Sequence, residues 1–320
     1  MNPSPKKRSP QKAKSRKKSR TEKFIRLLPS ILLLLLLAFS LFAAGYVIFF
    51  RTVVAGEIPL EMVSNMPSDT SRSNEDSSQQ ERRMHSVHHP LSATQRNLPK
   101  VAIIIDDMGY DEAIGKELLN FPIELTYSFL PFAPHTRKLE RLAHRAGKTV
   151  FLHLPLEPKD STFNPGPGAL YLSDSPETQK EKLAKCLQEV PHAVGINNHM
   201  GSAFTEDRLA MANIMEVIKG RSLMFVDSYT TPRTVGLQTA RQVMVESFGR
   251  SVFLDNEVDE EKICRQLEKL VLHAEKNGRA IGIGHPHRET MSAVNRCGDL
   301  YLNRVWYVGI REGCLSGKHK

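Results

Sequence analysis

The stretch VAIIIDDMGY, residues 101–110, runs from an apolar segment straight into two adjacent carboxylates. Four of its first five residues are β-branched, which is typical of a strand covered on both faces. Two neighbouring carboxylates repel each other unless one is protonated or a cation neutralises them. Asp106 and Asp107 therefore indicate either a cation site or a turn residue followed by a helix cap.

The pattern that begins at this stretch repeats along the chain. Short apolar or aromatic runs alternate with longer segments of helical period. The expected strands are 101–105, 126–130, 148–154, 193–197, 222–226, 251–254, 280–284 and 304–309. The expected helices lie around 111–120, 135–146, 177–190, 205–219, 235–247, 258–277 and 289–300. Strands that alternate with helices predict a parallel sheet covered by helices. Residues 100–320 are thus expected to form one α/β domain, a distorted (β/α) barrel of seven to eight parallel strands.

The positive charge of the chain is concentrated at its N-terminus. The net charge is +9, and residues 1–26 hold eleven Lys or Arg and one Glu, a local charge of +10. Subtracting this +10 from the total leaves about −1 for the other residues. A domain that grips phosphates would carry its own basic surface, so we expect no nucleic-acid partner.

The segment after the basic tail predicts a membrane anchor. Residues 27–50 contain 24 residues without a charge, and about 20 apolar residues span a bilayer. The positive-inside rule keeps residues 1–26 in the cytoplasm, so one transmembrane helix would precede the domain. The alternative is a cleaved signal peptide. Residues 51–99 include the polar run SDTSRSNEDSSQQERRMHSVHHP (68–90) and are expected to be a flexible linker. The predicted location is the inner membrane, with the domain on the periplasmic or extracellular side.

Polar residues follow most of the predicted strands. In a parallel barrel the carboxyl ends of all strands open on one face, where active sites lie. The residues expected there, beyond the first aspartate pair, are His153, Glu157, Asn198, His199, Asp227, Arg233, His285 and His287. Asp255 also follows a strand, but it opens the acidic run DNEVDEE and is expected on the surface.

These residue types suit a divalent metal, most readily zinc. Aspartate and histidine are ordinary zinc ligands, and a second aspartate beside the ion can accept a proton from an attacking water. The four cysteines show no C-x-x-C spacing, which argues against a cysteine-bound zinc. Export would permit disulfides, and Cys297 with Cys314 is the candidate pair.

Five motifs in order resemble the divergent branch of the polysaccharide deacetylase family. They are IIIDDMG, FLHLPLEP, NNHMGS, FVDS and GIGHPH, and the similarity extends over about residues 100–310. The resemblance implies a distorted (β/α) barrel that removes acetyl groups from a polysaccharide. It also implies roles for four residues: Asp106 as general base, Asp107 and His153 as metal ligands, and His285 as general acid.

The sequence departs from the family pattern at two places. Glu157 stands where a second metal histidine is usual, and NNHMGS replaces the usual R-P-P-Y segment. His199 supplies the missing imidazole in one interpretation, and Glu157 binds the metal in the other. In a third, the cleft binds an envelope glycan or serves as a scaffold without catalysis. Another metal hydrolase, such as a phosphodiesterase, fits the nearly neutral domain less well.

Overall fold

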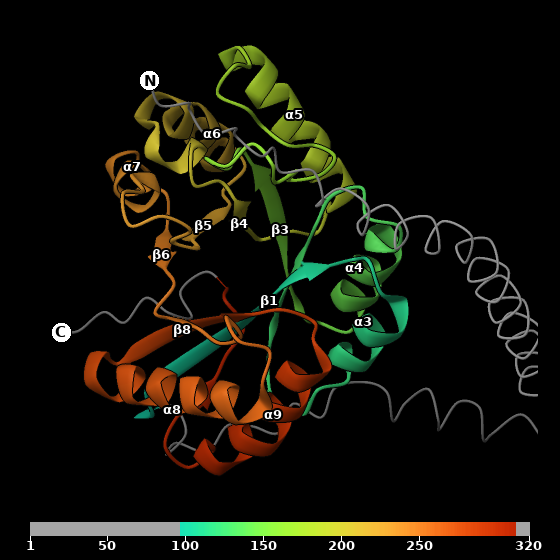
Figure 1. The fold of residues 1–320 in the computed structure, drawn as a ribbon, viewed down its shortest axis with the longest axis vertical. Helices are drawn as coiled ribbons and strands as arrows, with labels where there is room; N and C mark the ends of the chain where they lie inside the picture. Colours follow the sequence, from blue (N-terminus) through green and yellow to red (C-terminus); the bar gives the residue numbers. More distant parts are fainter. Residues whose placement is uncertain (1–96, 312–320) are drawn as a thin grey trace, which may run out of the picture. The chain divides into compact units, whose positions relative to one another are not determined.

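The computed structural model describes residues 97–311, all within the unit Asn74–Lys320 (Figure 1). The predicted tail 1–26, anchor 27–50 and nearly all of the linker 51–99 lie outside the described residues. Within 97–311, none of the helices has the length and apolar character needed to cross a membrane.

The described residues form one parallel sheet. Its strands are β1 Lys100–Met108, β2 Thr126–Phe129, β3 Thr149–Leu156, β4 Gly195–Met200, β5 Met224–Asp227, β6 Ser247–Gly249, β7 Val252–Phe253, β8 Arg279–Gly284 and β9 Trp306–Tyr307. The order is β6-β5-β4-β3-β2-β1-β8-β7, and β9 pairs with β1 beside this path. The parallel α/β architecture predicted from the alternation is therefore present, although no pairing in the described region joins β6 to β7.

The two ends of the sheet lie close together because the chain connects them directly. Only Arg250 and Ser251 separate β6 from β7. The end of β6 at Gly249 and the start of β7 at Val252 are therefore three residue steps apart, at most about 11 Å. The backbone N–H of Arg250 donates to Asp227 of β5 (3.0 Å), and that of Ser251 donates to Ile281 of β8 (2.8 Å). Residues 247–253 thus form one extended segment that changes its partner strand midway. The sheet curls into an incomplete barrel at this point.

Helices cover the outer face of the curled sheet (Figure 1). They are α3 Glu112–Leu119, α4 Thr136–Arg145, α5 Pro176–Glu189, α6 Arg208–Gly220, α7 Gly236–Gln242, α8 Glu260–Asn277 and α9 Arg288–Gly298, with 3₁₀ turns η3 Phe204–Glu206 and η4 Asp299–Tyr301. Four of these helices begin after a residue whose side chain accepts a hydrogen bond from a backbone N–H of the first turn. These capping residues are Asp111, Ser175, Asp207 and Asp259. Gly278, with φ of 76°, ends α8 in the left-handed conformation.

The predicted helix 235–247 is too long. α7 ends at Gln242, and Ser247–Gly249 pair with β5 as strand β6. The reason is tertiary, because Phe248 is buried among strand residues of the sheet interior. Local helical period cannot indicate that contact.

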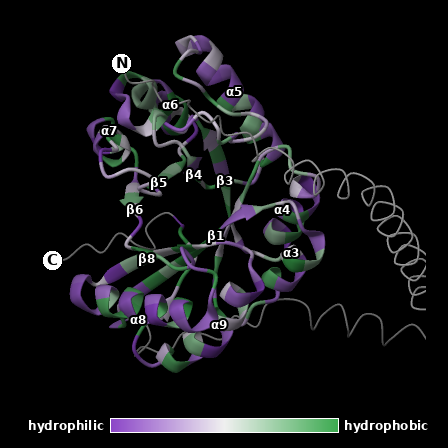
Figure 2. Cartoon of the chain, in the orientation of Figure 1, coloured by the Kyte–Doolittle hydropathy of each residue, from purple (hydrophilic) through white to green (hydrophobic). Residues whose placement is uncertain are grey.

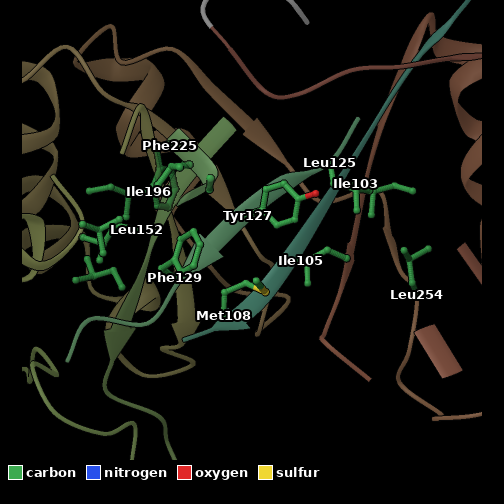
Figure 3. Packing of buried hydrophobic residues seen from close by; sticks show 14 of the residues in the cluster. Ile103, Ile105, Met108, Leu125, Tyr127, Phe129, Leu152, Ile196, Phe225 and Leu254 are labelled. Atoms are coloured by element: carbon green, nitrogen blue, oxygen red, sulfur yellow. The ribbon is translucent and has the colours of Figure 1, made fainter. Parts of the chain in front are cut away.

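Alternation along each strand divides the core into two clusters. Ile103 and Ile105 of β1 pack with Tyr127, Leu152 and many helix residues in the outer cluster (Figure 3). Ala102 and Ile104 pack instead with Phe151, Val226 and Ile283 in the inner cluster, where the described members include no helix residue. Residues of β1, β5 and β8 share the inner cluster because the sheet is curled.

The helices contribute one apolar face each to the outer cluster. In α8 the buried residues are Ile263, Leu267, Leu270, Val271 and Ala274, a spacing of three or four that places them on one face. Figure 2 shows polar and apolar residues on the same helix. Full burial of one such aliphatic side chain stabilises the fold by about 1.5–3 kcal/mol.

The segment after β9 covers the amino ends of the strands. The backbone N–H of Ile310 donates to the hydroxyl of Thr126, the first residue of β2 (2.9 Å). Arg311 Nε donates to the hydroxyl of Thr149, the first residue of β3 (2.9 Å). Ile310 itself is buried in the inner cluster. The amino-end side of the interior is therefore filled by the chain itself.

Cys264 of α8 and Cys297 of α9 form a disulfide, with their Cα atoms 5.7 Å apart. The predicted pair of Cys297 with Cys314 is therefore wrong. The two bonded cysteines lie 33 residues apart in sequence and meet because α8 packs against α9. Spacing alone does not encode that packing.

Candidate active site

A polar layer lies above the inner cluster, on the same face of the same strands. On β1 the inward residues Ala102 and Ile104 are followed two positions later by Asp106. The same period of two leads from Phe151 to His153 and from Ile283 to His285. It also places Ser128, Asn197 and His199 on this face. One alternation therefore gathers six polar residues at the carboxyl ends of five strands.

Asp107 reaches the same layer through a local irregularity of β1. Simple alternation would turn it toward the helices, away from Asp106. The register of β1 against β2 shifts between Ile105 and Met108, and Asp107 has φ of 54°, in the left-handed region. Aspartate tolerates that conformation better than most residues. The irregularity thus brings both carboxylates of the pair to one site.

Asp107, His153 and His199 converge on one point. Asp107 Oδ1 lies 3.3 Å from His153 Nε2 and 3.0 Å from His199 Nδ1. The two imidazole nitrogens lie 3.2 Å apart. Ligand atoms about 2.1 Å from a tetrahedral zinc ion lie about 3.4 Å from one another, so this triangle has the dimensions of three zinc ligands.

One oxygen of the Asp107 carboxylate, at a corner of this triangle, has no well-formed hydrogen bond within residues 97–311. Asp107 Oδ1 is buried and, among the described residues, accepts no hydrogen bond of normal geometry. A buried acceptor in that state is costly unless a cation or donor meets it. Burial raises the pKa of Asp107, but His153 and His199 outweigh this effect and lower its pKa far below the ordinary range. The three residues therefore fit a divalent metal ion.

Asp106 is the more basic member of the aspartate pair. Burial is the largest influence and raises the pKa of its carboxyl, whereas His153, His285 and the amide of Asn197 oppose that shift. A carboxylate with a raised pKa is a better proton acceptor near neutral pH. The difference in pKa between Asp106 and Asp107 suits a base and a ligand, respectively.

Asn197 of β4 contacts both the carboxylate of Asp106 on β1 and the imidazole of His153 on β3. Its Nδ2 donates to Asp106 Oδ1 (2.8 Å) and Oδ2 (3.0 Å). Its Oδ1 accepts from Ser128 Oγ (2.5 Å) and lies 3.2 Å from His153 Nδ1. All four residues are buried. Asn197 is the last residue of the predicted strand 193–197 and is not among the site residues predicted from the sequence.

His285 approaches the other oxygen of Asp107, and Asp255 holds its ring in place. Asp255 Oδ1 lies 3.0 Å from His285 Nδ1, and Asp255 Oδ2 accepts from the backbone N–H of His285 (2.6 Å) and from Thr290 Oγ1 (2.7 Å). Burial opposes protonation of the ring, but Asp255, Asp106 and Asp107 raise the pKa of His285 to about 9. Its other nitrogen, Nε2, lies 3.8 Å from Asp107 Oδ2.

Asp255 was expected on the acidic surface, and this expectation is wrong. Its side chain is buried, because the bend after β7 turns it toward β8 and the start of α9. The available signal was its place directly after a predicted strand, the same place that Asp106 occupies.

Five other candidates lie away from the triangle. Glu157 accepts from the backbone N–H of Leu172 (2.5 Å), so its carboxylate stabilises the loop before α5. Asn198 and Asp227 point to the other face of their strands. Asn198 accepts a hydrogen bond from the backbone N–H of Ser228. Asp227 accepts from the backbone N–H groups of Tyr229 and Leu237. Arg233 is exposed and pairs with Glu206 (3.1 Å). His287 is exposed before α9, its ring centre 5.9 Å from that of His285.

The chain has known relatives. Residues 103–307 match the divergent polysaccharide deacetylase family, and the chain belongs to this family. The resemblance inferred from the five motifs is therefore confirmed.

The relatives include two bacterial proteins named only as uncharacterized. The Escherichia coli K12 protein YibQ is 33% identical over 203 residues, which are 62% of this chain and 61% of YibQ. A Haemophilus influenzae protein is 32% identical over 195 residues, 61% of this chain and 69% of its own length. The chain thus spans about three fifths of the length of YibQ.

A solved structure shares the fold. The crystal structure of the uncharacterized protein ATU2773 from Agrobacterium tumefaciens has a TM-score of 0.64 and 26% sequence identity. The match covers 69% of this chain and 90% of that protein.

Proposed function

We propose that this chain is a metal-dependent hydrolase that removes acetyl groups from an envelope or extracellular polysaccharide. Membership of the polysaccharide deacetylase-like family supports the reaction class. The observation that carries the proposal is the buried, donor-free oxygen of Asp107 between His153 Nε2 and His199 Nδ1. Asp106 Oδ2 lies 3.6 Å from His153 Nε2, and His285 Nε2 lies 3.8 Å from Asp107 Oδ2, so a candidate base and a candidate acid both border this group.

Asp107, His153 and His199 would hold one divalent ion, most readily zinc. Such an ion supplies Lewis-acid chemistry, polarising the acetyl carbonyl and stabilising the charge that develops on its oxygen. Glu157, whose carboxylate is engaged by Leu172, does not take part in this ligand set.

The remaining steps belong to the protein's own side chains. Asp106 accepts a proton from the water that attacks the acetyl carbon, since its raised pKa makes it an effective base. His285 Nε2 donates a proton to the leaving nitrogen or oxygen of the sugar. Asp255 keeps the ring oriented by binding Nδ1 and keeps it protonated by its charge.

We also propose that the enzyme works outside the cytoplasm, held at the inner membrane by residues 27–50. The support is the uncharged 24-residue segment after the basic tail. Appending a reporter that is active only outside the cytoplasm to the C-terminus of the full chain tests the orientation. A cytoplasmic signal would overturn this part of the proposal.

Metal analysis and acetate release test the activity. The purified full chain is expected to take up about one zinc ion and to release acetate from chitin oligosaccharides or peptidoglycan fragments. A chain that takes up no zinc and releases no acetate from any acetylated glycan refutes the proposal. That result would favour a glycan-binding module on the same fold.

A further inference from the structure

We propose that Asn197 is a positioning residue whose single amide group sets the tautomer of His153 and orients Asp106 at the same time. The inference rests on the proposed metal-dependent hydrolase. Asn197 would neither bind the ion nor transfer a proton. Its amide would instead prepare His153 for metal binding and Asp106 for proton transfer.

The orientation of the amide follows from its contacts. One end of Asn197 faces both oxygens of Asp106 at 2.8 and 3.0 Å, and only the nitrogen can donate to two acceptors. The reverse orientation would place the amide oxygen against both carboxylate oxygens. The hydroxyl of Ser128 donates to the other end, which is consistent with an oxygen there.

The tautomer of His153 follows from the amide. The amide oxygen lies 3.2 Å from His153 Nδ1, and an oxygen at that distance is matched by an N–H donor. A neutral imidazole carries one hydrogen, so Nε2 keeps its lone pair. That lone pair lies on the side of Asp107 Oδ1 and His199 Nδ1, the other two corners of the triangle.

Burial makes this arrangement strict. Asn197 is fully buried, and the side chains of His153 and Asp106 are only 2% and 4% exposed. Bulk water therefore cannot replace the amide at either neighbour, and an unpaired polar group there costs about 1–3 kcal/mol. Residues of this kind, which hold the second nitrogen of a ligand imidazole, typically change metal affinity about 10- to 100-fold when mutated.

Two substitutions separate the two tasks. Asn197→Asp keeps an acceptor for His153 Nδ1 but removes the donor to Asp106 and adds a like charge beside it. We expect zinc affinity within about threefold of wild type and activity lowered at least about 100-fold. Asn197→Leu removes both contacts, so zinc affinity should also fall about 10- to 100-fold.

The experiment uses the full chain, with zinc affinity measured against a chromophoric chelator and acetate release measured in parallel. Asn213→Asp is the matched control, because Asn213 lies on α6 and bonds Gln179 instead of the site. Equal zinc affinity of the Leu variant and wild type would overturn the inference, as would equal zinc affinities of the Asp and Leu variants. If the Leu variant fails to fold, the split between affinity and activity in the Asp variant decides.

Nitrogen NMR of histidine distinguishes this inference from the proposed function. In the zinc-free wild type, at a pH where the ring is neutral, His153 should carry its hydrogen on Nδ1. The Leu variant should lose that preference. This result would stand even if the wild type released no acetate. A hydrogen on Nε2 in the wild type would refute the tautomer assignment whatever the activity.

Discussion

Two clusters of aspartate and histidine lie at the carboxyl ends of the strands, and they differ in how the aspartate is satisfied. In the first, Asp107 Oδ1 lies between His153 and His199 without accepting a well-formed hydrogen bond. In the second, the Asp255 carboxylate is engaged by the ring and backbone of His285 and by Thr290. The same residue types therefore serve two purposes. A buried carboxylate oxygen without a donor suits a cation, and a fully hydrogen-bonded carboxylate suits the orientation of an imidazole.

The largest expected effect is at the first cluster. Asp107→Asn keeps the side-chain size and tolerates the left-handed backbone at φ of 54°, so the fold should persist. Zinc uptake should be lost, and acetate release should fall by at least about 10³-fold. Metal content by mass spectrometry, measured beside activity, checks this. Full zinc occupancy in the variant would show that the triangle is not the metal site.

The next largest effect is at the second cluster. His285→Gln should lower acetate release by about 10²- to 10⁴-fold, because the general acid is removed. Zinc content should remain at the wild-type level, since Asp107, His153 and His199 are untouched. Loss of zinc in this variant would mean that the two clusters form one metal site.

A smaller effect, with a characteristic pH dependence, is expected from Asp255→Asn. The pKa of His285 is raised to about 9, mainly because Asp255 outweighs the effect of burial. Without that charge the pKa should fall toward about 6.5, and the protonated fraction at pH 8 should drop about 30-fold. At pH 6 the two proteins should differ by less than about twofold from this cause. A pH–rate profile measures the divergence, and a constant ratio at all pH values would refute this role for Asp255.

The interaction between Asp255 and His285 also makes the stability of the fold depend on pH. Because the folded pKa of His285 is above its unfolded value, the stabilisation is complete below about pH 6.5 and is lost as the pH rises through about 9. The difference in unfolding free energy between wild type and Asp255→Asn should therefore be larger at pH 6 than at pH 9.5. Denaturant unfolding at the two pH values tests the sign. A larger difference at pH 9.5 would contradict it.

The smallest effect is expected from Glu157→Gln, which makes the same carboxylate-to-amide change as Asp107→Asn. The amide oxygen of glutamine can still accept from Leu172 N–H, so the loop should be retained. Zinc affinity should stay within about threefold of wild type, because the carboxylate contacts no corner of the triangle. A loss comparable to that of Asp107→Asn would restore Glu157 as the third ligand.

Part of the candidate site was predictable from alternation alone. Once Ile104 and Ile283 are taken as inward residues, counting by two reaches Asp106 and His285. The same count places Asn198 and Asp227 on the outer side, where they bond loop backbone instead of the site. Their position near the end of a strand makes both residues candidates, but it does not say which face of the sheet their side chains occupy.

Three other features of the site could not be predicted from strand alternation. Asp107 enters the site only through the register shift of β1, which depends on pairing with β2. The contact of Asp255 with His285 joins residues 30 positions apart. The choice between His199 and Glu157 also depended on the neighbouring strand, because β4 places His199 beside Pro155 of β3.

Three features were predictable from the residues alone: the parallel α/β class, the family, and Asp106 with Asp107 as site residues. Each depends on local period or on short motifs such as IIIDDMG. The tertiary structure alone decided the partner change of residues 247–253, the disulfide between Cys264 and Cys297, and the meeting of Asp107, His153 and His199. The physical reason is common to all three. Each depends on contacts between segments distant in sequence, whose energy arises only once the sheet has curled and the helices have packed against it.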